Sequence, residues 1–264
     1  PPTLIEIERI GQLESEVFGP VLHVLRYREG KLAALIASIN ATGYGLTHGI
    51  QTRIDETIES VCARIRAGNI YVNRNMIGAV VGVQPFGGEG LSGTGPKAGG
   101  PHYLRRLARG VVAPLAAAID AAMILPGPTG ESNALSLHPR GRVACIADVE
   151  GTLHAQVRLA TATGNVALLT RSPLTENVAA GLRDRCEIVA DALAAAPDAI
   201  LFAGGEERAL EIRQALAAAD GPIVPILIVD AHRPGDPTRL VFERTLTINT
   251  TASGGNASLL SLAD

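Results

Sequence analysis

The sequence predicts an α/β protein. From Val143 onwards, short apolar runs alternate with helical patterns, which is the order expected of a parallel sheet with right-handed crossovers. Residues 1–110 also alternate strand and helix patterns, and they end in a long glycine-rich loop. Aromatic residues make up only 3% of the chain, and Trp is absent. Small aliphatic residues must therefore fill the core, as in closely packed helix–sheet layers.

The first part of the chain, residues 1–110, has three strand patterns and two amphipathic helix patterns. The strands are expected at Thr3–Ile7, Val21–Tyr27 and Ile70–Asn73, and the helices at Lys31–Ala41 and Ile54–Ala67. Gly68 follows the second helix as a candidate C-terminal cap. Gly78–Gly100 is predicted to be a loop, because about a third of its residues are glycine.

The second part begins after a linker predicted at 111–130, where an Ala-rich stretch ends in Leu125-Pro126-Gly127-Pro128. Residues 131–240 are predicted to form a small Rossmann-like domain without catalytic residues. Its strands are expected at 143–147, 166–169, 199–203 and 223–229, and its helices at 153–163, 175–185 and 206–219. Residues 241–264 should form an antiparallel or edge strand over Thr245–Asn249, followed by a tail rich in small residues.

Composition excludes several classes of protein. The net charge of −3 does not fit a nucleic-acid-binding surface, and no apolar run is long enough for a transmembrane helix. The three cysteines, Cys62, Cys145 and Cys186, form no CxxC pair, so we expect no metal site and three inert, buried thiols. The N-terminus lacks signal-peptide features. It reads as mid-domain sequence, so we expect natural chain upstream of it. The reduced state expected of the three cysteines suits a cytoplasmic location.

The run Glu16-Val17-Phe18-Gly19-Pro20-Val21 resembles a motif of the aldehyde dehydrogenases. The resemblance implies that Glu16 accepts hydrogen bonds from the nicotinamide ribose of NAD and that Phe18 packs near the nicotinamide ring. A carboxylate suits a vicinal diol because it only accepts hydrogen bonds and has two oxygens. The competing interpretation is a solvated glutamate before a hydrophobic turn.

The loop from Gly78 to Gly88, continuing through Gly93–Tyr103, resembles the glutamate-semialdehyde branch of the same family. The resemblance implies that Gly78 and Ala79 present backbone N–H groups to the substrate carboxylate and that Phe86 packs against its aliphatic part. A glycine leaves its N–H accessible because it has no Cβ. Tight loop packing is the alternative explanation for the glycines. We expect Lys97 to be a solvated loop residue and His102 to make a structural hydrogen bond.

The family uses a cysteine nucleophile, and none of the three cysteines lies in a matching motif. We therefore assign no catalytic residue within this sequence, and we expect the nucleophile and the phosphate-binding loop upstream. The Rossmann-like segment lacks a G-x-G-x-x-G motif, and Gly204-Gly205-Glu206-Glu207 places two acids where a pyrophosphate would sit. We expect no dinucleotide there.

The end of the chain, Glu243–Leu260, and the segment Leu125–Asn133 resemble the proline utilization A family. This implies the C-terminal part of a bifunctional enzyme that oxidises L-glutamate γ-semialdehyde with NAD. An FAD-dependent proline dehydrogenase is expected upstream, with substrate passing internally between the two sites. The tail, with Leu259, Leu260 and Leu262, would cover that passage.

Two alternatives stay open. One is a monofunctional semialdehyde dehydrogenase with an appended domain, against which the terminal motif argues. The other is a purely structural or assembly module, a role that we expect for residues 111–264. Homo-oligomerisation, and peripheral association of the whole enzyme with the inner membrane, are compatible with the sequence and not decided by it.

Overall fold

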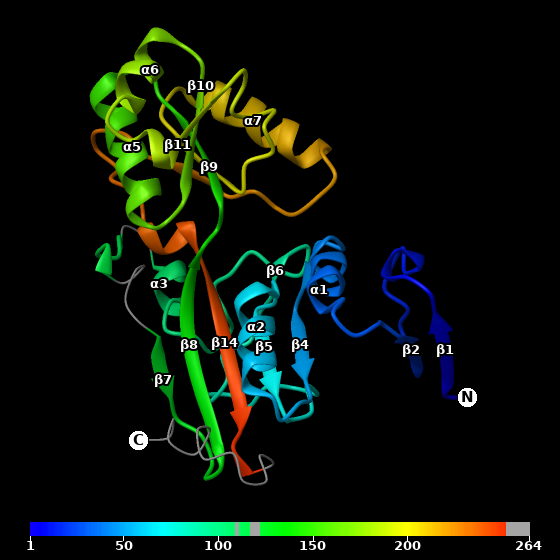
Figure 1. Cartoon of the computed structure of the whole chain (residues 1–264). Helices are drawn as coiled ribbons and strands as arrows, with labels where there is room; N and C mark the ends of the chain where they lie inside the picture. The colour runs from blue at the N-terminus through cyan, green and yellow to red at the C-terminus, as the bar shows by residue number, and fades with distance from the viewer. Residues whose placement is uncertain (109–110, 117–121, 252–264) are drawn as a thin grey trace.

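The computed structural model describes residues 1–108, 111–116 and 122–251. Two five-stranded sheets dominate it: a mixed sheet and a parallel sheet above it in Figure 1. Two further two-stranded sheets complete the strand content of this part of the chain. The α/β fold class is confirmed.

The mixed sheet joins segments from both ends of the chain. Its order is β4 (Thr47–Ile50), β5 (Asn69–Val72), β14 (Val241–Asn249), β8 (Glu131–Pro139) and β7 (Met123–Leu125). The first three strands are parallel, and β8 and β7 run antiparallel to their neighbours. Strand β14 aligns Thr245 with Asn69 on one side and Thr247 with Asn133 on the other.

The prediction of an antiparallel or edge strand at Thr245–Asn249 is confirmed for the antiparallel pairing, which β14 makes with β8. The edge alternative is wrong, since β14 is the central strand of this sheet. Leu246 and Ile248 pack with the helices on one face. Thr245 and Thr247 face the other side, where they are buried and hydrogen-bonded rather than solvated. The alternation of apolar and polar residues thus reflects one apolar face and one buried polar face.

Helices α1 (Leu32–Asn40) and α2 (Asp55–Arg64) cover the apolar face of the mixed sheet. This part of the core comprises Ile36, Ile50, Ile58, Val61, Ile65, Ala67, Ile70, Val72 and Ile248. Helix α2 ends before Gly68, which is not its cap. Gly68 instead packs so close to the Gly87 carbonyl that a Cβ would collide with it. Its small size serves loop packing.

The parallel sheet forms the Rossmann-like unit. Its order is β11 (Cys186–Val189), β10 (Val166–Thr170), β9 (Arg142–Ile146), β12 (Ala199–Phe202) and β13 (Ile226–Ile228). Alternate residues of each strand face opposite sides. Val143 and Cys145 pack with α5 (Glu150–Ala162) and α6 (Pro173–Ala179), whereas Ala144 packs with α7 (Glu206–Ala218). The pattern analysis missed the short strand β11.

The boundary predicted for the Rossmann-like domain differs from the sheet assignment. Strand β8 lies within the predicted range 131–240, and β7 lies within the predicted linker, yet both belong to the mixed sheet. The chain passes from β8 through Arg140 and Gly141 straight into β9, as Figure 1 shows. The parallel sheet therefore begins at Arg142, because one extended segment serves two sheets in succession.

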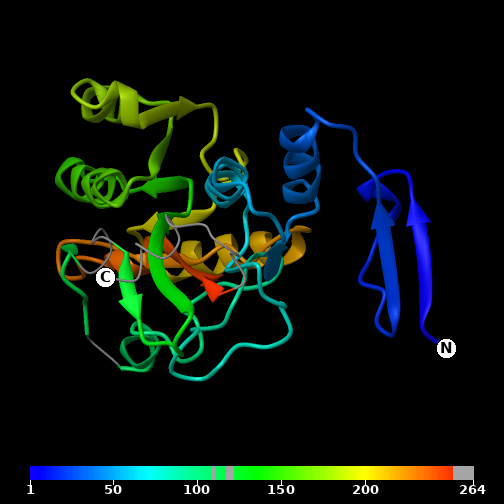
Figure 2. The same cartoon turned by 60° about the horizontal axis from the view of Figure 1, so that its bottom comes forward.

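The remaining elements are short. Strands β1 (Thr3–Ile7) and β2 (Val21–Leu25) form a parallel pair, and β3 (Tyr44–Gly45) pairs with β6 (Glu89–Gly90). The short helices are α3 (Tyr103–Leu107) and the 3-10 turns η1 (Ile10–Gln12), η2 (Arg183–Arg185) and η3 (Pro237–Leu240). Figures 1 and 2 both show β1 and β2 lying apart from the two large sheets.

The tail segment predicted to cover an internal passage, including Leu259, Leu260 and Leu262, lies outside the described residues. Among the described helices, none combines the length and apolar character needed to cross a bilayer.

Candidate functional site

The segment Gly78–Gln84, hereafter the anchor loop, contains Gly78 and Ala79, the two residues predicted to present backbone N–H groups to the substrate carboxylate. Gly78 is exposed and has a left-handed φ of 74°, which favours glycine. In the part of the chain that the structure describes, the backbone N–H groups of Gly78 and Ala79 have no acceptor. Two successive unpaired N–H groups at an exposed turn are suited to an anion.

The rest of the glycine-rich loop is held by buried polar side chains. Asn69, at the start of β5, donates from Nδ2 to the Pro85 carbonyl at 3.0 Å. Its Oδ1 accepts from the Gly87 N–H at 3.2 Å and from Lys97 Nζ at 2.6 Å. The Thr245 hydroxyl on β14 donates to the same Pro85 carbonyl at 2.9 Å. Phe86 is half-buried, and its backbone pairs with Ala98. The loop therefore rests on the polar face of β5 and β14.

Lys97 is a buried anchor of this loop, which corrects the prediction that it is solvated. Its side chain is only 2% exposed, and Nζ also donates to the Gly87 carbonyl at 2.6 Å. Burial lowers the pKa of Lys97 to about 7, although the nearby Glu243 opposes this shift. The sequence offered no signal for this role, because a loop lysine beside glycines ordinarily extends into solvent.

Glu243 on β14 contacts the same loop from the sheet. Its Oε2 accepts from the backbone N–H of Lys97 at 2.7 Å, and burial raises the pKa of the carboxyl group. His102, for which we predicted a structural hydrogen bond, has a buried Nδ1 without a partner among the described residues. That prediction is not supported for Nδ1.

The residues predicted to bind NAD lie elsewhere. Glu16 and Phe18 are in the connection between β1 and β2, which is separate from the anchor loop in Figures 1 and 2. Glu16 is exposed, and the Phe18 ring is 94% exposed. The structure therefore brings together Gly78, Ala79 and Phe86 in one loop, but it does not bring Glu16 and Phe18 next to them.

The three cysteines have the properties of structural thiols. Burial raises the pKa of Cys62, Cys145 and Cys186, which keeps each thiol protonated. Cys145 is fully buried, and the other two are half-buried. Within the described ranges, no cluster of His, Cys, Asp and Glu could hold a metal ion.

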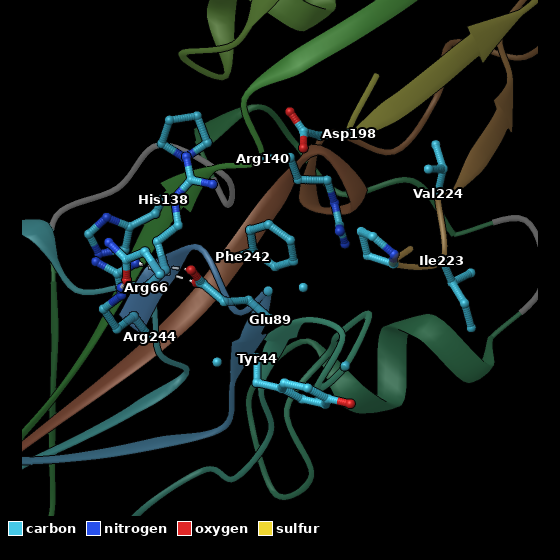
Figure 3. A pocket seen from close by; sticks show the side chains of 17 residues that line it. Tyr44, Arg66, Glu89, His138, Arg140, Asp198, Ile223, Val224, Phe242 and Arg244 are labelled. Atoms are coloured by element: carbon cyan, nitrogen blue, oxygen red, sulfur yellow. Dashed lines mark hydrogen bonds and ion pairs between the residues drawn. The ribbon is translucent and has the colours of Figure 1, made fainter. Parts of the chain in front are cut away.

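A polar cavity of about 210 Å³ is lined by residues of the mixed sheet, of the glycine-rich loop and of the Rossmann-like unit (Figure 3). Arg140 stands over the Phe242 ring at 4.3 Å, and its Nη2 donates to the Thr94 carbonyl at 2.7 Å. Arg244 is paired with Glu89 at 3.4 Å. Burial, with Arg244 nearby, lowers the pKa of His138 to about 4. None of the predicted site residues lines this cavity, and among its charged groups Arg244 pairs with Glu89 while Arg140 donates to the backbone carbonyls of Arg239 and Thr94.

Comparison with known proteins also separates the first part of the chain from the Rossmann-like unit. Residues 8–112 match the aldehyde dehydrogenase family, and this segment contains η1 to α3 together with the whole glycine-rich loop. A 1-pyrroline-5-carboxylate dehydrogenase from Geobacillus thermodenitrificans is 45% identical over 92 residues, which cover 35% of this chain and 18% of that protein. The fold and the loop thus define an aldehyde dehydrogenase segment, extended by a second α/β unit.

The extended architecture is that of the bifunctional PutA proteins. The chain is 43% identical to the bifunctional protein PutA of Salmonella typhimurium over 99% of its own length. A PutA structure from Corynebacterium freiburgense shares the fold over 94% of this chain and 27% of that chain, with a TM-score of 0.64 and 22% identity. This chain belongs to the PutA family and corresponds to its C-terminal part. It spans about a quarter of the length of the Salmonella protein, 24%.

Proposed function

We propose that this chain carries the substrate-anchoring part of an NAD-dependent L-glutamate γ-semialdehyde dehydrogenase within a bifunctional proline-catabolic enzyme. The observation that best supports this proposal is that the N–H groups of Gly78 and Ala79, on an exposed turn, have no acceptor among the described residues. An amino acid aldehyde differs from simple aldehydes by its carboxylate and amine, and two convergent N–H donors recognise a carboxylate. The similarity of 35% of this chain to a 1-pyrroline-5-carboxylate dehydrogenase supports the same substrate.

The residues between β1 and β2 suit the nicotinamide and its ribose at one end of NAD. Glu16 offers an exposed carboxylate to a ribose diol, and the exposed Phe18 ring offers an apolar surface to a planar heterocycle. NAD, when bound, supplies the hydride acceptor. In this proposal Glu16 orients the ribose, Gly78 and Ala79 hold the substrate head, and Phe86 contacts its aliphatic portion. The nucleophilic cysteine lies in sequence outside this chain.

We also propose that the whole enzyme is bifunctional. Similarity to PutA extends through β8, the Rossmann-like unit and β14, which favours the bifunctional enzyme over a monofunctional dehydrogenase with an appended domain. An FAD-dependent proline dehydrogenase, upstream domains as intramolecular partners and a cytoplasmic location belong to this proposal. An assay of the full-length protein for flavin content and proline oxidation tests it, and a flavin-free protein inactive on proline would leave the monofunctional alternative.

The anchor loop is tested with Ala79→Leu in the full-length enzyme. The added bulk should obstruct the carboxylate site and lower kcat/KM for glutamate semialdehyde by roughly tenfold or more, the loss expected when hydrogen bonds to a charged group are removed. The control is Val81→Leu, because Val81 is an exposed residue of the same loop. A simple aliphatic aldehyde should be oxidised almost normally by both variants. Equal losses for both aldehydes would remove the loop from the substrate site.

A further inference from the structure

The side chain of Gln84 bonds to the backbone of the anchor loop. Gln84 is 2% exposed, and its Oε1 accepts from the backbone N–H of Val80 at 2.8 Å. The backbone N–H of Gln84 donates to the Val80 carbonyl at 2.9 Å. Gln84 thus bonds to both polar backbone groups of Val80, and the Val83 N–H also donates to the Val80 carbonyl at 3.1 Å. Val80 directly follows Gly78 and Ala79 in the chain. Fixing the backbone of Val80 therefore constrains the direction of the Gly78 and Ala79 N–H groups.

The amide nitrogen of Gln84 leaves the loop and reaches β8. Its Nε2 donates to Glu131 Oε1 at 2.7 Å and to Asn133 Oδ1 at 3.2 Å. A carboxylate only accepts hydrogen bonds, so Glu131 requires the nitrogen of the Gln84 amide on its side and the oxygen toward Val80. The orientation of the amide that holds the anchor loop is therefore dictated from β8.

The acceptors on β8 are themselves fixed. Glu131 Oε2 pairs with Arg74 at 3.2 Å, and both side chains are largely buried. Asn133 Oδ1 also accepts from the Thr247 hydroxyl on β14 at 2.7 Å, and Asn133 Nδ2 donates to Glu131 at 3.0 Å. A continuous buried network thus runs from Val80 through Gln84 to β8 and β14. Buried networks of this kind favour one arrangement of their members. In this one, Arg74 Nη1 is a buried donor that has no partner among the described residues.

We infer that Gln84 is a positioning residue through which β8 and β14 set the preference of the dehydrogenase for an amino acid aldehyde. Glu131, Asn133 and Thr247 lie outside the segment that matches the aldehyde dehydrogenase family, residues 8–112. The added C-terminal strands therefore act on substrate recognition and do more than cover the sheet. This inference rests on the proposed function, in which the anchor loop holds the substrate carboxylate.

The test uses Gln84→Glu in the full-length enzyme. The new carboxylate would face the Glu131 carboxylate and lose both donated hydrogen bonds, so the loop should shift. We expect KM for glutamate semialdehyde to rise about tenfold or more, because hydrogen bonds to a charged partner are lost. Because the loop binds the substrate head uniformly, kcat should change little, and oxidation of a simple aliphatic aldehyde should stay near the parent value.

Rescue distinguishes positioning from general stabilisation. Combining Gln84→Glu with Glu131→Gln restores a donor facing an acceptor, with the roles exchanged, and should recover most of the lost affinity. Gln156→Glu is the matched control, because Gln156 is a buried glutamine of the Rossmann-like unit whose Nε2 bonds to the Ile146 and Val229 carbonyls. That variant should lower the melting temperature and leave the ratio between the two aldehydes unchanged.

A milder variant covers the case in which Gln84→Glu does not fold. Thr247→Val removes the hydroxyl that holds Asn133 and keeps the shape of the side chain, and it should raise KM for the semialdehyde by about threefold to tenfold, the worth of one hydrogen bond. Equal loss for both aldehydes in these variants would overturn the inference. If Ala79→Leu discriminates between the aldehydes and the network variants do not, the inference fails while the proposed function stands. If Ala79→Leu does not discriminate, the proposed function itself fails.

Discussion

At the scale of single residues, the glycine-rich loop is organised by the buried polar groups beneath it. Asn69, Lys97 and Glu243 meet the loop from β5, from the loop itself and from β14. Asn69 and Glu243 satisfy backbone groups of the loop from the strands, and Lys97 satisfies the Gly87 carbonyl from within the loop while it is held by Asn69. The conformation of the loop is therefore a property of the strands on which it lies.

The buried Lys97 predicts a specific pH dependence of stability. Its pKa is lowered from 10.5 to about 7 by burial, so the folded chain releases this proton while the unfolded chain retains it. Between pH 7 and 10.5 the unfolded state binds more protons, and the free energy of unfolding should therefore rise with pH, by at most about 1.4 kcal/mol per pH unit.

Chemical denaturation of the parent and of Lys97→Met over this pH range measures the contribution. The parent should gain stability with rising pH relative to Lys97→Met, and Lys31→Met provides the control because Lys31 is the only other lysine and is exposed. Parallel pH profiles for the parent and Lys97→Met would show that Lys97 is titrated alike in both states.

Glu16 gives a second prediction at this scale. Glu16→Ala in the full-length enzyme should raise KM for NAD about tenfold, since losing hydrogen bonds to a charged acceptor costs roughly 1.5–3 kcal/mol. Glu14→Ala, at a neighbouring exposed glutamate, should behave like the parent. Steady-state kinetics with varied NAD separates the two variants, and an unchanged KM and kcat in Glu16→Ala would exclude Glu16 from the cofactor site.

At the scale of elements, the Rossmann-like unit has the sheet order of a nucleotide-binding fold, and we predict that it binds no dinucleotide. Gly205 precedes α7, and Glu206 and Glu207 occupy the first turn. Their carboxylates already interact favourably with the positive end of the helix dipole, and they would repel a pyrophosphate. Fold alone therefore does not make this unit a cofactor domain.

The corresponding prediction concerns the stoichiometry of NAD. Calorimetric titration of the full-length enzyme should give a single equivalent of NAD per chain. Replacing Glu206 and Glu207 together by glutamine should leave that value unchanged. A second equivalent that disappears after alteration of the α7 N-terminus would assign a dinucleotide to the Rossmann-like unit.

At the scale of the whole molecule, β8 and β14 tie the two units together. Strand β14 returns from the Rossmann-like unit to pair with β5, so the last described strand of the chain completes a sheet begun near residue 47. The chain cannot lose this strand without exposing the edge of β5 and the buried polar face under the loop. The second unit is therefore structurally coupled to the dehydrogenase segment.

The tail beyond this strand is tested by truncation after Thr251 in the full-length enzyme, which retains the Thr250 N–H bond to the Gly130 carbonyl. If the tail covers the passage between two active sites, conversion of proline to glutamate should slow and show a lag. Proline oxidation and semialdehyde oxidation, measured separately, should persist. Unchanged coupled flux would show that the tail has no sealing role.

The sequence by itself determined the α/β class, the glycine-rich loop and most helices and parallel strands, because these depend on local periodicity and on glycine. Helices α1, α5 and α7 lie within a few residues of their predicted limits. The resemblance of the motifs also located the candidate residues Glu16, Phe18, Gly78, Ala79 and Phe86 before any geometry was known.

Only the tertiary structure decided which segments share a sheet and which polar side chains hold the loop. Strand β14 looks amphipathic in sequence, yet its polar residues are buried because Asn133 and the Pro85 carbonyl accept from them. Gln84 and Glu131 are 47 residues apart, and Lys97 and Glu243 are 146 apart. Hydrogen bonds between such distant residues leave no periodic trace in the chain, since each depends on the packing of elements that local sequence does not encode.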